Sequence, residues 1–126
     1  MSAVEVSTSA GRVARGVVAA KSFRRGETIE VAPVIVVPRS QSTVLKQTKI
    51  DDYAFQWGGG SLAVALGCGS LYNHSYSPNA DYDQDTKNLS MRFTAIRPIP
   101  KGEQITINYN GSPDCPAPLW FPVEDV

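Results

Sequence analysis

The chain has 126 residues, of which 12 are Lys or Arg and 12 are Asp or Glu, so its formal net charge is zero. A chain of this length supports one modest hydrophobic core, which argues for one domain. The balanced charge argues against a protein that holds nucleic acid directly through a general cationic excess. The longest apolar stretch, residues 31–37, is far shorter than the roughly 20 residues that a membrane-spanning helix needs, so we expect no membrane contact.

In chain order, strands are expected at residues 4–7, 17–20 and 28–37, the last interrupted at Pro33, where proline indicates a sheet edge or a bulge. The one expected helix lies within residues 40–49, with Ser42 as its N-cap. Residues 53–57 and 62–66 flank three consecutive glycines and predict a hairpin. After a long loop over residues 67–80, residues 81–84 and 89–96 predict a second hairpin, and residues 105–109 a last strand.

The chain carries no repeat, linker or low-complexity tract, and its 10 glycines and 9 prolines are spread throughout. This distribution favours many short strands joined by turns. We therefore expect one mainly β domain over residues 1–126, with little helix, a core at about residues 4–110 and an aromatic tail at 111–126.

The two cysteines, Cys68 and Cys115, are too few for a disulfide scaffold and do not form the pairs of a zinc site. The N-terminus lacks the basic region and apolar core of a signal peptide. These features predict an intracellular, cytoplasmic protein that binds no metal.

His74 is the only histidine, so a Ser-His-Asp triad would have to use it. Nothing in the sequence indicates that a serine hydroxyl lies against its ring in the folded chain. A metal site would need His74 with Asp81, Asp83 or Asp85, but their alternation is more typical of a solvated strand face. The glycine-flanked residues 11–16 fail the spacing of a phosphate loop. A turn whose backbone N–H groups approach a ligand and a plain β-turn both remain open there.

Two further features have a functional and an ordinary interpretation. Residues 71–79 combine many hydrogen-bonding side chains, which fits either a functional loop or an ordered turn network. The five tyrosines fit either packing at the core edge or an aromatic channel for a long apolar side chain that ends in an amine; they are Tyr53, Tyr72, Tyr76, Tyr82 and Tyr109.

Three segments, in this order, resemble the SET-domain protein-lysine methyltransferases, and most closely the short stand-alone members of viruses and bacteria. Residues 14–27 are similar to the family's opening motif, a glycine turn, a strand and a basic turn that ends in Gly-Glu. Residues 73–79, Asn-His-Ser-Tyr-Ser-Pro-Asn, match its Asn-His-Ser-x-x-Pro-Asn signature, and residues 102–109 match its Gly-Glu strand that ends near a tyrosine. The resemblance covers roughly residues 4–121.

The resemblance implies several small twisted β-sheets around a C-terminal pseudoknot, in which the segment ending in Asn73-His74 lies beside the strand that leads to Tyr109. It implies S-adenosyl-L-methionine as the cofactor, S-adenosyl-L-homocysteine as the product, and no metal. By position, Tyr109 is the catalytic residue. The implied cofactor-binding residues are Arg15, Gly16, Asn73, His74, Tyr109 and Trp120. The implied lysine-channel residues are Tyr53, Tyr82, Ile107 and Phe121, with Ile107 influencing how many methyl groups are added.

The chain departs from the family pattern at three places. Ala14 replaces the first glycine of the opening motif, and Tyr76 replaces the usual cysteine after Asn-His-Ser. The cysteine-rich zinc tail is missing, since Cys115 stands alone, so we expect the aromatic tail or a partner to cover the site.

Tyrosine walls suit the implied chemistry, because an amine attacks only when neutral and free lysine has a pKa near 10.4. An apolar channel beside the positive sulfonium lowers that pKa by desolvation and like-charge repulsion, so no separate base is required. The expected substrate is an exposed lysine in a basic protein tail, a histone or a similar protein, which would extend the location to the nucleus or chromatin. The alternative is a catalytically silent SET-like module that binds a peptide or partner, and a homodimer is a further expectation.

Overall fold

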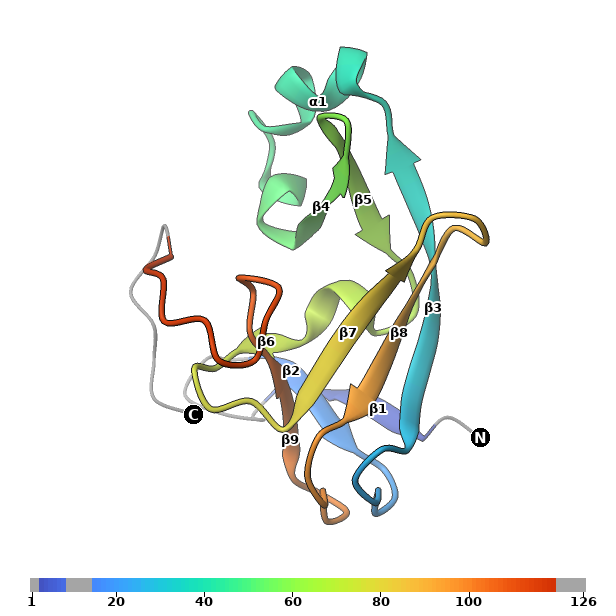
Figure 1. Cartoon of the computed structure of the whole chain (residues 1–126), viewed down its shortest axis with the longest axis vertical. Helices are drawn as coiled ribbons and strands as arrows, with labels where there is room; N and C mark the ends of the chain where they lie inside the picture. Colours follow the sequence, from blue (N-terminus) through green and yellow to red (C-terminus); the bar gives the residue numbers. More distant parts are fainter. Residues whose placement is uncertain (1–2, 9–14, 120–126) are drawn as a thin grey trace.

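The computed structural model describes residues 3–8 and 15–119, and it consists mainly of two β-sheets (Figure 1). The four-stranded sheet has the order β1-β2-β9-β6, with β1 at Val4–Ser7, β2 at Gly16–Ala19, β9 at Gln104–Ile107 and β6 at Asn73–His74. The five-stranded sheet has the order β4-β5-β3-β8-β7, with β4 at Ala54–Gly58, β5 at Ser61–Ala65, β3 at Thr28–Val37, β8 at Ser90–Ala95 and β7 at Ala80–Asp85. The prediction of a mainly β fold is confirmed.

The two predicted hairpins are confirmed as β4–β5 and β7–β8. The first turns through Gly58, Gly59 and Gly60, which all have positive φ, a conformation that glycine adopts without steric cost. In the second hairpin the pairing runs without a break from Ala80 with Ala95 to Asp85 with Ser90.

β3 lies in the middle of its sheet, so the prediction that Pro33 marks a sheet edge or a bulge is wrong. The strand pairs with β8 through residues 28–33 and with β5 through residues 34–37. Pro33 therefore sits where the strand exchanges partners, and its carbonyl accepts the N–H of Leu66 at 2.8 Å. The irregular register lies instead between Thr28 and Glu30.

The only α-helix of the described residues, α1, spans Arg39–Leu45 and is followed by the 3₁₀ helices η1 at Lys49–Tyr53 and η2 at Gly69–Leu71. The prediction that Ser42 is the N-cap is wrong. Pro38 occupies that position with an extended backbone, and the Ser42 hydroxyl donates to the carbonyl of Arg39 at 2.9 Å inside the helix. None of the helices in the described part of the chain is long and apolar enough to cross a membrane.

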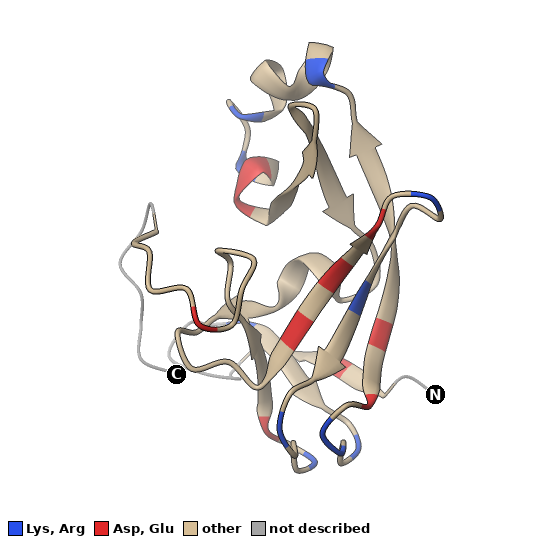
Figure 2. Cartoon of the chain, in the orientation of Figure 1, with Lys and Arg blue, Asp and Glu red and all other residues tan. Residues whose placement is uncertain are grey.

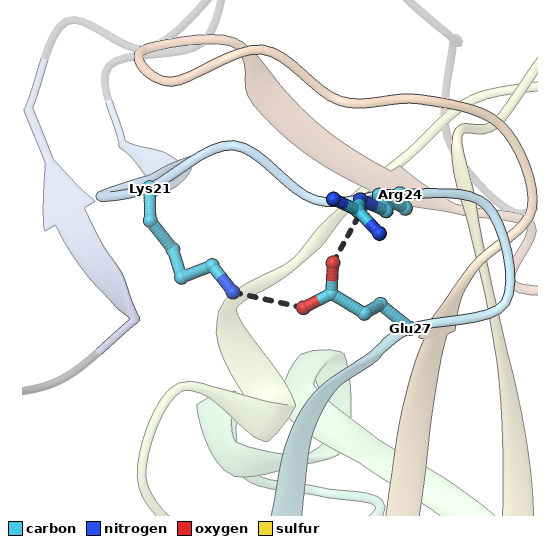
Figure 3. A network of polar contacts seen from close by, with 3 residues as sticks. All are labelled: Lys21, Arg24 and Glu27. Carbon is cyan, nitrogen blue, oxygen red and sulfur yellow. Dashed lines mark hydrogen bonds and ion pairs between the residues drawn. The ribbon is translucent and has the colours of Figure 1, made fainter.

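A single buried cluster joins the two sheets. Its largest fully buried side chains include Tyr72, Phe93, Met91, Ile99 and Ile105. The basic turn between β2 and β3 packs against the chain after β8, where Phe23 and Ile99 form an isolated β-bridge. The Glu27 carboxylate closes this turn by accepting the Lys21 ammonium at 2.8 Å and the Arg24 N–H at 2.9 Å (Figure 3). The Lys21 bond, then the Arg24 bond, lower the pKa of Glu27.

The segment that ends in Asn73-His74 lies beside the last strand, as the family resemblance implies. β6 pairs with β9 in parallel, with Asn73 opposite Thr106 and His74 opposite Ile107. Asn79, only 2% exposed, fixes the end of the same motif: its side chain donates to the Gln104 carbonyl at 2.8 Å and accepts the Thr106 N–H at 2.9 Å. Two segments that are distant in the sequence are thus locked together beneath the site.

Candidate active site

A cleft of about 670 Å³ opens where the ends of several elements meet, and four tyrosines line it. Tyr53 ends η1, Tyr82 lies on β7, Tyr72 precedes β6, and Tyr109 follows β9. The structure therefore brings Tyr53, Tyr82 and Tyr109, which the sequence singled out, into one site. Tyr72, one of the five tyrosines that suggested an aromatic channel, joins them although no specific role was predicted for it.

The tyrosines are held by aromatic and polar contacts. The Tyr109 hydroxyl donates to the carbonyl of Tyr72 at 2.5 Å. The Tyr82 ring meets Phe55 edge to face, with the centroids 5.4 Å apart. The Arg15 guanidinium donates to the Tyr53 hydroxyl at 2.9 Å and lies 5.7 Å from that ring's centroid, so Arg15 connects the opening motif to the cleft.

Tyr109 is a neutral hydrogen-bond donor at physiological pH. Burial, followed by the nearby Tyr53 and Tyr82, raises the pKa of Tyr109 to about 12. Burial also raises the pKa of Tyr82, with a smaller effect from Asp81. The cleft thus presents uncharged phenols to whatever enters it.

His74 supports Tyr109 from the side of β6. Its Nδ1 accepts the backbone N–H of Tyr109 at 2.9 Å, so the proton of the neutral ring sits on Nε2. Among the described residues Nε2 is buried without a hydrogen-bond partner. Burial lowers the pKa of His74, which keeps the ring neutral and Nδ1 an acceptor. His74 does not line the cleft and its Nδ1 is occupied, so it is not a base for the cleft.

Asn73 joins the opening motif to the last strand. Its side-chain N–H₂ donates to the Arg15 carbonyl at 2.8 Å and to the Gln104 side chain at 2.7 Å. Its side-chain oxygen accepts no hydrogen bond from the part of the chain that the structure describes. Asn73 and His74 therefore offer one acceptor and one donor beside Arg15 and Gly16, which suits a polar ligand.

Acidic side chains surround the cleft. Asp51, Asp52 and Asp83 line it together with one cation, Lys46. Asp52 pairs with Lys49 at 2.9 Å, whereas Asp51 and Asp83 form no ion pair within the described residues. In Figure 2 acidic residues are coloured on η1 and along β7, the two elements that carry Asp51, Asp52 and Asp83.

Of the predicted lysine-channel residues that the structure describes, Ile107 alone is not at the cleft wall, and the predicted cofactor residues Arg15, Gly16, Asn73 and His74 do not line it either. Ile107 is fully buried in β9, opposite His74, and does not line the cleft. Trp120 and Phe121, like Ala14, lie outside the described residues. The described part of the tail folds back on the turn that carries Tyr109, since the Asn110 side chain donates to the Ala117 carbonyl at 2.9 Å.

No group of three or more His, Cys, Asp or Glu side chains that could hold a metal ion occurs within residues 3–8 and 15–119. Sequence reasoning assigned no specific role to Tyr72, Phe55 or Asn110, which line the cleft. For Tyr72 a signal existed, since it directly precedes the Asn73-His74 motif. Phe55 and Asn110 carry no distinctive local pattern.

Comparisons with known proteins agree with this geometry. The family model described as SET domain matches residues 14–110. A Schizosaccharomyces pombe protein, histone-lysine N-methyltransferase, H3 lysine-37 specific, is 30% identical over 111 residues, covering 87% of this chain and 71% of that protein. The crystal structure of a candidate histone methyltransferase of Plasmodium falciparum is 26% identical, with a TM-score of 0.66, over 89% of this chain and 96% of that one.

A second similar structure is the autoinhibited Polycomb Repressive Complex 2 of Chaetomium thermophilum bound to S-adenosylmethionine. It has a TM-score of 0.71 at 19% identity, covers 86% of this chain but 15% of that one, and shows the fold alone. The match to the family model spans most of the sequence, and the relatives share both the fold and the enzyme class. The chain therefore belongs to the SET-domain family of protein-lysine N-methyltransferases.

Proposed function

We propose that this protein transfers a methyl group from S-adenosylmethionine to the side-chain amine of a lysine in a basic protein segment, such as a histone tail. The observation that carries the proposal is the convergence of Tyr53, Tyr82 and Tyr109, from three separate parts of the chain, on one cleft edged by carboxylates. The names of the similar proteins support a histone as the substrate class.

The residues beside the cleft fit the cofactor. Asn73 has a side-chain oxygen that accepts nothing from the described residues, and His74 has a buried Nε2 without a partner there. An amine, a carboxylate or a ribose hydroxyl would satisfy these atoms. Asn73, His74, Arg15 and Gly16 would hold the cofactor, which supplies, when bound, a methyl group on a positively charged sulfur.

The tyrosine walls prepare the lysine amine. A substrate lysine enters as an ammonium ion with an ordinary pKa near 10.4, and burial between uncharged phenols favours loss of its proton. The raised pKa of Tyr109 keeps its hydroxyl protonated, so it does not act as a charged base. Its one proton is donated to the Tyr72 carbonyl, so its oxygen would orient the amine or the methyl group as an acceptor. Positioning of this kind removes much of the entropic barrier to the displacement.

The acidic edge selects the substrate. Asp83 is exposed and Asp51 half-buried, and neither forms an ion pair within the described residues. They would attract the cations that flank a target lysine in a basic segment, and the attraction would weaken as salt screens it. A histone substrate would place the enzyme on chromatin.

The test is incubation with a labelled methyl donor and a panel of histones and cell lysate proteins, followed by mass spectrometry of the labelled lysines. We expect label on lysines in basic segments, and none with Tyr109→Phe. Calorimetric titration with S-adenosylmethionine tests cofactor binding separately. A protein that binds no S-adenosylmethionine and labels no lysine would contradict the proposal.

A further inference from the structure

We propose that Glu30, a residue of β3 outside all the recognised motifs, is a positioning residue for Tyr109 and acts through Tyr72. The inference rests on the proposed function, in which Tyr109 contacts the reacting atoms. Glu30 is partly buried, and both of its carboxylate oxygens are engaged: Oε1 accepts the Tyr72 hydroxyl at 2.7 Å, and Oε2 accepts the backbone N–H of Cys68 at 3.0 Å.

Tyr72 is fixed at both of its ends. Its side chain is 1% exposed and packs on Phe93, with the ring centroids 4.5 Å apart. A hydroxyl at this depth needs a partner, and Glu30 provides it. The carbonyl of the same residue accepts the Tyr109 hydroxyl at 2.5 Å. Tyr72 therefore connects the Glu30 carboxylate on β3 to the Tyr109 hydroxyl in the cleft, so the position of the first affects the position of the second.

Tyr72 also determines where β6 begins. It directly precedes Asn73 and His74, and the His74 ring accepts the backbone N–H of Tyr109. A shift of Tyr72 would therefore move both the acceptor of the Tyr109 hydroxyl and the residue that holds the Tyr109 backbone. Burial, with a contribution from Glu30, raises the pKa of Tyr72, so its hydroxyl remains a donor over the working range of pH.

Gly67 provides the space for the Glu30 carboxylate. Its φ is +60°, and a Cβ placed on it would lie 2.5 Å from Oε2 of Glu30. Gly59, in the turn between β4 and β5, has nearly the same φ of +61°, but a Cβ there would meet nothing within 4 Å. The chain thus offers two Gly→Ala changes with the same backbone strain, of which one alone displaces the carboxylate.

The first test compares these glycines. Gly67→Ala should lower kcat about tenfold or more at saturating substrates, because a displacement of a catalytic group by about 1 Å costs up to about a hundredfold. Gly59→Ala should leave kcat unchanged while lowering the melting temperature through the same strain. Equal kcat values for the two variants would overturn the proposal.

The second test asks whether Glu30 acts through Tyr72. Glu30→Gln and Tyr72→Phe should each lower kcat about tenfold to a hundredfold, with KM for peptide and cofactor changed less than about threefold. The double variant should be no slower than the slower single variant, because both changes break one connection. Multiplicative losses would mean that the two residues act independently and would refute the mechanism.

A readout without turnover separates this inference from the proposed function. With ¹³C-labelled tyrosine, the Tyr109 ring resonance should shift in Glu30→Gln and Gly67→Ala and stay in place in Gly59→Ala. A shift in a protein that methylates nothing would sustain the positioning role and reject the proposed function. An unmoved Tyr109 resonance in an enzyme that methylates lysine would reject the positioning role of Glu30 and sustain the proposed function.

Discussion

Removing a single oxygen atom from Tyr109 should abolish most methyl transfer and leave the fold intact. In Tyr109→Phe the ring keeps its place near His74, whose centroid lies 5.2 Å away, and the backbone bond to His74 Nδ1 remains. What disappears is the hydroxyl in the cleft and its 2.5 Å bond to the Tyr72 carbonyl. The change therefore removes the Tyr109 hydroxyl and leaves the contacts that hold the Tyr109 ring and backbone.

The two expected magnitudes differ greatly. Loss of one neutral hydrogen bond changes the free energy of unfolding by about 1 kcal/mol, which for a chain of this size lowers the melting temperature by about 4 °C. Loss of a preorganised hydrogen-bonding group at the reacting atoms costs about a hundredfold to a thousandfold in kcat, or about 3–4 kcal/mol of transition-state stabilisation. The effect on catalysis should thus exceed the effect on stability severalfold.

The assay is single-turnover methyl transfer from labelled S-adenosylmethionine to a lysine peptide, with cofactor affinity measured by calorimetry and unfolding by circular dichroism. Tyr76→Phe is the matched control, because the Tyr76 hydroxyl donates to the Ala117 carbonyl at 2.8 Å and lines no part of the cleft. If Tyr109→Phe retained a rate within about threefold of the wild type, the role of the Tyr109 hydroxyl in orienting the reacting atoms would be refuted.

Three other predictions concern the residues around Tyr109. Asn73→Ala removes two hydrogen bonds beside the cofactor residues and should raise the calorimetric Kd for S-adenosylmethionine about tenfold; an unchanged Kd would remove Asn73 from that site. Neutralising Asp51 and Asp83 together should raise KM for a lysine peptide with flanking arginines about threefold to tenfold at low salt. The increase in KM should be small at about 0.5 M salt, which screens the charges. Neutralising Glu5 on β1, the control, should leave KM unchanged. The folded state holds the pKa of His74 below its ordinary value near 6.5, so as the pH falls the unfolded chain binds the proton first. The free energy of unfolding, measured with urea, should therefore decrease below about pH 6.5 in the wild type. The decrease should be smaller in His74→Asn, which has no group that titrates there.

Local patterns predicted the hairpins well, because three consecutive glycines and a short polar turn each specify their own geometry. They failed at Pro33 and Ser42, where the outcome depends on distant parts of the chain. Pro33 is accommodated because β3 changes partner from β8 to β5 at that point, and no feature of residues 28–37 indicates the exchange. Pro38, not Ser42, is the N-cap of α1 because the chain ends its sheet pairing at Val37.

The residues of the site were predictable where they belong to a sequence motif or lie at a fixed spacing from one. Tyr109 and Tyr82 were placed by their spacing from recognised segments, and the cleft contains both. Tyr72 was named as one tyrosine of a possible channel, but its place was not predicted, because its role comes from two hydrogen bonds that span 42 and 37 residues. Such bonds depend on how β3, β6 and β9 are brought together, and that arrangement has no local signature.

The net charge of zero does not describe how the charges are distributed over the folded chain. In Figure 2 cations lie on the turns at the end of the molecule away from α1 and also on and after α1. The charged residues that line the cleft are three acids, Asp51, Asp52 and Asp83, and one cation, Lys46. At physiological salt the Debye length is about 8 Å, so a ligand at the cleft responds to the charges around it and hardly to those at the far end. A chain that is neutral as a whole can therefore still attract a basic segment to Asp51 and Asp83. The balanced total excludes a protein that is cationic throughout, and it places no limit on what a single face of the fold recognises.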